Sequence, residues 1–200
     1  MKRIVLALLA LMPLLLMAQD NTWEQPKAGT NPDQKYLKGA VPEVDGRVTF
    51  KTTIKAPGKT KEQIYNIVLA ELTRMTKDPG QFEQSRIVLA DTLGHSQVVG
   101  TYQEWLVFKS TALVLDRTRL FYNLIASVSD GELELTMTRI YYLYDEERTP
   151  TTYQAEEWIT DRYGLTKKMN KLARVSGKFR RKTIDRKDYL FMRFGELLGK

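Results

Sequence analysis

An alternation of polar and apolar residues over 132–144, directly after an Asp130-Gly131 pair, constrains the fold more than any other feature. In its first half Glu or Thr alternates with Leu or Met. Because successive side chains of a β-strand point to opposite faces, this half predicts a strand with one buried face and one face near water. Asp-Gly is typical of a two-residue turn between antiparallel strands. From residue 140 onward every position is apolar, which predicts that the sheet is covered on both faces there.

The remaining elements follow from the same kinds of pattern. Thr60 and Gln63 have the spacing of a capping box, which predicts a helix from there to about residue 76. Two short helices are expected at 155–163 and 166–172, and a longer one at 183–198 with an apolar stripe. Four further β-branched or aromatic runs predict strands at 47–54, 86–90, 97–108 and 117–128.

The predicted order is strand, helix, four antiparallel strands and then helices. A crossover helix followed by a meander of strands places the helices on one face of the sheet. The sequence therefore predicts an α+β fold: a curved antiparallel sheet with helices packed on one face, of the TBP-like or helix-grip type.

The N-terminus has the features of a secretory signal peptide. Lys2 and Arg3 precede an apolar run over 4–17, and Ala18 stands where a signal peptidase would cut. The run is shorter than the roughly 20 residues that span a bilayer. We therefore expect a signal peptide at 1–18, a flexible linker at 19–44 and a single domain at 45–200, exported to the periplasm or the cell surface.

The rare residues exclude several chemistries. The chain has no Cys and one His, His95. One chain therefore contains no thiolate metal site, no thiol nucleophile and no zinc site with two His ligands, and we predict no metal and no cofactor. No Ser lies in a G-x-S-x-G motif. Carboxylates such as Glu104, Glu156 and Glu157 leave open a small carboxylate- or Ser-dependent hydrolase, although acidic residues at 156–157 also suit the first turn of a helix.

The basic C-terminal region is the most distinctive feature of the charge distribution. The chain carries a net charge of +7, and residues 162–200 contain 13 Lys or Arg against 3 Asp or Glu. Such a region either pairs with the acidic body of the domain or binds an anionic ligand, a glycan or an anionic lipid surface. Export argues against nucleic acid. The predicted anion-binding residues are Lys178, Arg180, Arg181 and Lys182.

Aromatic residues gather on the predicted strands. They are either core residues or the lining of a ligand pocket between the sheet and a helix. Trp105 and Tyr142 are the predicted ligand-binding residues of such a pocket.

Four segments resemble a known family. They are YLKGAVPEVDG at 36–46, STALVLDRTR at 110–119, AEEWITD at 155–161 and SGKFRRKTID at 176–185. The chain resembles an exported Bacteroidetes domain family of unknown function with a TATA-binding-protein-like fold. This resemblance implies the fold and an exported location, but no reaction and no functional residue, since a fold does not carry a function.

These observations favour an exported, non-enzymatic binding or scaffolding domain whose partner is an unknown envelope component or an anionic ligand. The hydrolase and the docking of the basic region on anionic lipid or glycan are the alternatives. The sequence does not predict the oligomeric state.

Overall fold

The computed structural model describes residues 21, 23, 24 and 33–199, so the predicted signal peptide lies outside the described residues. The predicted α+β order is confirmed. Strands form one antiparallel sheet in the order β3-β7-β6-β5-β4, and β8 pairs with the end of β7. The strands of this sheet are β3 (Phe50–Lys55), β4 (Arg86–Ala90), β5 (Gln97–Thr111), β6 (Val114–Ser129), β7 (Glu132–Tyr144) and β8 (Thr151–Gln154). A separate pair of short strands is formed by β1 (Glu43–Val44) and β2 (Arg47–Val48).

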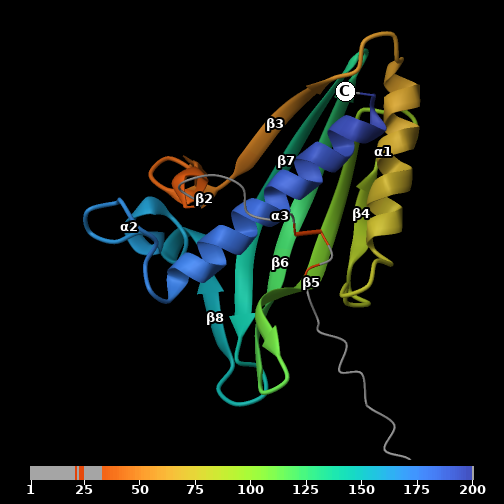
Figure 1. Cartoon of the computed structure of the whole chain (residues 1–200). Helices are drawn as coiled ribbons and strands as arrows, with labels where there is room; N and C mark the ends of the chain where they lie inside the picture. The colour runs from red at the N-terminus through yellow and green to blue at the C-terminus, as the bar shows by residue number, and fades with distance from the viewer. Residues whose placement is uncertain (1–20, 22, 25–32, 200) are drawn as a thin grey trace, which may run out of the picture.

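Two long helices cover the same face of the sheet, as Figure 1 shows. Helix α1 (Lys61–Met75) begins at the predicted capping box of Thr60 and Gln63. Helix α3 (Ser176–Leu197) crosses the strands diagonally in Figure 1. The core lies between this layer and the sheet, and its apolar side chains come from both helices and from alternate strand positions.

The predicted turn at Asp130-Gly131 joins β6 to β7 and is confirmed. Gly131 has a φ of +69°, a conformation that glycine adopts without strain. The carboxylate of Asp130 also accepts a hydrogen bond of 2.8 Å from the backbone N–H of Lys61. This turn therefore also binds the N-terminus of α1, where a negative charge is favourable.

Helix α3 begins earlier than predicted, at Ser176 instead of Thr183. The Ser176 hydroxyl donates to the carbonyl of Tyr163, and Gly177 lies so close to Leu172 that an added Cβ would be 2.8 Å from that side chain. These contacts fix the start of the helix before the basic residues within 178–182, which we call the basic run, so that this run lies within α3. The apolar stripe is confirmed at the buried residues Ile184, Leu190, Phe194 and Leu198, whereas Phe191 and Leu197 are half-buried.

The predicted short helices were partly wrong. Residues 155–163 form two short pieces, η2 (Ala155–Glu157) and α2 (Asp161–Gly164). Residues 166–172 are not helical: Leu165 and Leu172 pair as an isolated bridge, and Met169 has a φ of +54°. The loop closes through these backbone contacts, which local helix propensity does not anticipate. Strand β8 was not predicted.

The predicted flexible linker is packed on the domain where the structure describes it. Tyr36, in η1 (Gln34–Tyr36), and Val41 are both buried in the core. The side-chain amide of Asn21 bonds to both backbone groups of Val107. The prediction of a flexible linker is therefore wrong for residues 33–44, because two apolar residues in a polar segment are enough to anchor it when the domain offers matching sites.

Candidate binding surface on the uncovered face of the sheet

The face of the sheet opposite α1 and α3 is the candidate functional surface. Residues of β5, β6 and β7 alternate between buried positions under the helices and half-buried positions on this other face. Such alternation is typical of an antiparallel sheet with one face near solvent. We call this second side the uncovered face.

Aromatic rings and arginines lie together at one end of the uncovered face. The rings of Phe82 and Trp105 meet edge to face with centroids 5.0 Å apart. The guanidinium of Arg117 lies 3.7 Å from the Trp105 ring centroid, and that of Arg119 lies 3.8 Å from the Phe82 centroid. A cation over an aromatic ring is attracted to it by about 0.5–1 kcal/mol at an exposed site.

These two arginines also have acidic partners. Arg119 forms a bidentate ion pair with Glu146, with N–O distances of 2.9 and 2.6 Å. Arg117 lies 3.5 Å from a carboxylate oxygen of Glu147. Both glutamates come from the connection between β7 and β8. The charge at this end of the face is therefore balanced within the domain.

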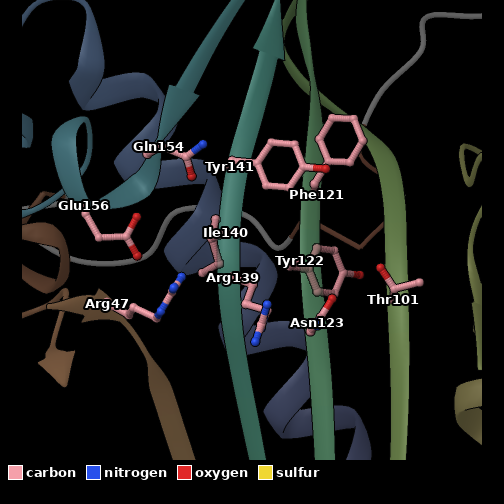
Figure 2. A pocket seen from close by; sticks show the side chains of 10 residues that line it. All are labelled: Arg47, Thr101, Phe121, Tyr122, Asn123, Arg139, Ile140, Tyr141, Gln154 and Glu156. Carbon is pink, nitrogen blue, oxygen red and sulfur yellow. The ribbon is translucent and has the colours of Figure 1, made fainter. Parts of the chain in front are cut away.

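A hollow of about 350 Å³ lies further along the same face. Figure 2 shows the rings of Phe121 and Tyr141 at one end of it, Arg139 and Asn123 at the other, and Arg47 and Glu156 at its side. The two rings are stacked, with centroids 4.2 Å apart and planes inclined by 9°. The hollow is lined by Arg47, Thr101, Phe121, Tyr122, Asn123, Arg139, Ile140, Tyr141, Gln154 and Glu156.

A β-bulge places Arg139 in this hollow. Phe121 pairs with Tyr141 and Asn123 pairs with Thr138, so two residues of β7 stand opposite the single residue between them on β6. Arg139 is exposed, while the next residue, Ile140, is buried at 1% exposure. Without the extra residue, the alternation would have turned Arg139 toward the core and Ile140 toward solvent.

The bulge requires an unusual backbone conformation. Arg139 has a φ of +54°, in the left-handed region that a non-glycine residue enters at a cost of roughly 1–2 kcal/mol. The other described non-glycine residues with positive φ, which are Asp45, His95, Asp145 and Met169, lie outside the strands of the sheet. Strain of this kind is concentrated at functional sites.

The bulge also explains the change of pattern that the sequence shows after residue 139. Ile140 and Tyr142 are buried under the helices, whereas Tyr141 and Leu143 are half-buried on the uncovered face. The prediction of a sheet covered on both faces is thus wrong for this stretch, because the bulge shifts the alternation by one residue and large side chains pack beside one another on the uncovered face.

The predicted anion-binding cations of α3 lie in ion pairs with the rest of the domain. Lys178 lies 2.6 Å from a carboxylate oxygen of Asp116, and Arg181 lies 2.5 Å from one of Asp33. Lys182 pairs with Glu24. This arrangement corresponds to the first of the two interpretations of the basic region, in which its charges face acidic groups of the same chain.

Arg180 has a different place from its neighbours, since its side chain is fully buried. Its guanidinium donates hydrogen bonds of 2.6–2.7 Å to three backbone carbonyls and to the carboxylate of Asp161. Burial lowers the pKa of Arg180. Two of those carbonyls belong to Tyr36 and Leu37, so Arg180 holds the N-terminal segment against α3. All three guanidinium nitrogens donate hydrogen bonds within the domain, so the group is not presented to a ligand.

The two predicted aromatic residues lie on opposite faces of the sheet. Tyr142 is fully buried, its hydroxyl lies 2.7 Å from that of Thr183, and burial raises its pKa. Trp105 lies on the uncovered face with Arg117 over its ring. The structure therefore does not bring the predicted site residues together.

Of the charged and amide residues of the hollow, sequence reasoning named only Glu156, as a candidate catalytic carboxylate, and missed the others. Arg47, Asn123, Arg139 and Gln154 lie on four different strands and in no local motif. The only signal in the sequence was the break in alternation at residue 139, which marks a bulge when a strand continues beyond it.

Two of the three carboxylates considered for catalysis, Glu104 and Glu156, have structural partners, whereas Glu157 is exposed. Glu104 is buried against Arg186, and Glu156 accepts a hydrogen bond of 2.8 Å from the backbone N–H of Val48. His95 lies in a turn with its ring 5.0 Å from that of Tyr65. Within the described part of the chain, no group of three or more His, Cys, Asp or Glu side chains is placed to hold a metal ion. None of the described helices has the length and hydropathy of a membrane span.

Known proteins with this architecture identify the family. A crystal structure of a DUF4468 family protein from Bacteroides ovatus is 38% identical to this chain, with a TM-score of 0.75 over 84% of this chain and 95% of that one. A TBP-like protein from Parabacteroides distasonis is 15% identical, with a TM-score of 0.61 over 79% of this chain and 96% of that one, which shows a shared fold alone.

The family description agrees with these structures. Among curated proteins, none matches this chain. Residues 50–143 match a family described as a domain of unknown function (DUF4468) with a TBP-like fold. The resemblance that the sequence indicates and the predicted fold class are both confirmed, and the chain belongs to the DUF4468 family.

Proposed function

We propose that this chain is an exported, non-enzymatic domain that binds an envelope ligand on the uncovered face of its sheet. The observation that carries the proposal is the hollow beside the stacked rings of Phe121 and Tyr141, where charged and amide side chains surround an open space. Concave sites that combine aromatic walls with a few polar groups are typical of ligand binding. Export is proposed from the pattern of residues 1–18.

The two alternatives receive less support. A hydrolase needs a nucleophile and a base within hydrogen-bond reach of each other, and two of the three carboxylates considered for this role, Glu104 and Glu156, are used in structural contacts. Docking through the basic region would require Lys178, Arg181 and Lys182 to exchange their carboxylate partners for the anionic surface.

The proposal is tested by passing an extract of the bacterial envelope over the immobilised mature chain and measuring the mass retained. We expect Phe121→Ser combined with Tyr141→Ser to reduce retention at least tenfold, because both changes remove the wall of the hollow. The matched control is Leu113→Ser, which removes an apolar side chain that is 95% exposed at the tip of the β5–β6 hairpin. Equal retention by the double variant, or no retention by the unaltered chain, would contradict the proposal.

A further inference from the structure

The hollow on the uncovered face holds two guanidinium groups that form no ion pair within the described part of the chain. Arg47 and Arg139 are both exposed, and neither forms an ion pair with any described residue. This distinguishes them from Arg117 and Arg119 on the same face, which pair with glutamates. A guanidinium presents its donors as a planar fork that matches the two oxygens of a carboxylate.

The neutral polar groups of the hollow are also unused. The side chains of Thr101, Asn123 and Gln154 make no hydrogen bond to the described part of the domain. An amide side chain offers both donors and acceptors, as does a hydroxyl. The Glu156 carboxylate lies at the side of the hollow (Figure 2). One of its oxygens accepts the hydrogen bond from the Val48 N–H, and the other adds an acceptor to the hollow. Such a mixture suits a ligand with several hydroxyl groups.

The stacked aromatic pair limits the ligand further. Phe121 and Tyr141 lie against each other at 4.2 Å, so no slot remains between them for a flat base or ring system. Their outer surface is apolar and suits the C–H groups of a saturated ring. The volume of about 350 Å³ lies near the lower end of the roughly 300–1,000 Å³ range of small-molecule sites. The hollow is therefore large enough for a small ligand or for one part of a larger one.

We infer that this hollow binds a saccharide that bears a carboxylate, with the carboxylate held by Arg139 and Arg47, the hydroxyls by Asn123, Gln154 and Glu156, and a ring face against Phe121 or Tyr141. This inference rests on the proposed function and names the ligand class for the same site. The left-handed backbone of Arg139 supports it independently, because glycine would adopt that conformation without strain whereas arginine supplies the charge.

The test is titration calorimetry of the mature chain with trigalacturonate, its methyl ester and inorganic phosphate. The ester keeps the sugar rings and removes the charge, and phosphate keeps the charge without the sugar. We expect trigalacturonate to bind at least tenfold more tightly than either control. Arg47→Gln and Arg139→Gly should each weaken this binding at least tenfold, while Arg139→Gly raises the melting temperature because it removes the strained residue.

Arg174→Gln is the matched control, since Arg174 is exposed and lies outside the hollow. This substitution removes one positive charge, as Arg47→Gln and Arg139→Gly do. It should leave trigalacturonate binding unchanged. Equal binding of acid and ester, no binding of trigalacturonate, or equal loss in Arg174→Gln would overturn the inference. If the envelope extract is still retained through Phe121 and Tyr141 in that case, the proposed function stands and only the ligand class is wrong.

Discussion

Arg186 of α3 and Glu104 of β5 form a bidentate ion pair inside the core, with N–O distances of 2.7 and 2.9 Å and side chains that are 4% and 8% exposed. The pair is extended by a hydrogen bond of 2.8 Å from the side-chain amide of Gln81 to Glu104. Desolvation opposes the charge on Arg186, but the neighbouring carboxylate outweighs it and raises the pKa of the guanidinium. Helix α3 is thus bound to the sheet by charge as well as by apolar packing.

Breaking this pair should be costly. We expect Glu104→Gln to lower the free energy of unfolding by about 3–5 kcal/mol, because it leaves the Arg186 charge buried without its counterion. Glu104→Met combined with Arg186→Met should lose much less, since no charge remains buried. Urea denaturation measures both, and a single variant as stable as the double variant would show that the pair is not desolvated.

The adjacent arginines of α3 should differ sharply in their effect on stability. Arg180→Ala removes the donors to three backbone carbonyls and to Asp161, and each buried group left unsatisfied costs about 1–3 kcal/mol. Arg181→Ala breaks a partly exposed ion pair with Asp33, which is worth about 0–1 kcal/mol. Urea denaturation should rank them in that order, and limited proteolysis should cut residues 33–44 faster in Arg180→Ala alone. Equal stabilities would contradict a structural role for Arg180.

Asp91 should make the stability of the domain depend on pH in the acid range. The Ser96 hydroxyl, and then the Gly94 N–H, bond to its carboxylate and lower its pKa from 3.8 to about 2. A carboxyl whose pKa is lower in the folded state contributes stability above the unfolded pKa and loses it as the pH falls through the folded one. The wild type should therefore melt above Asp91→Asn at pH 6, and this difference should shrink between pH 4 and pH 2. A difference that is constant over this range would exclude the carboxylate charge as its source.

Export is tested by mass spectrometry of the protein from a periplasmic or surface fraction. If residues 1–18 are a signal peptide, the recovered chain should begin near Gln19. A chain recovered with Met1 intact would contradict the proposed export.

The sequence alone determined the order and type of the main elements. The capping box of Thr60 and Gln63, the Asp130-Gly131 turn and the alternation in β7 each depend on residues close together in the chain. Short-range geometry decides such features, so they can be derived before any tertiary contact is known. The same local patterns also indicated the α+β fold class.

Only the tertiary structure decided which charges are free. The basic run of α3 is prominent in the sequence, yet its partners Glu24, Asp33, Asp116 and Asp161 lie 19 to 158 residues away along the chain. Conversely, Arg47 and Arg139 are inconspicuous in sequence and meet at one hollow because β2 and η2 lie beside β7 and because a bulge turns Arg139 outward. Electrostatic pairing depends on distance in space, and that distance is set by strand register and helix packing, which no local pattern encodes.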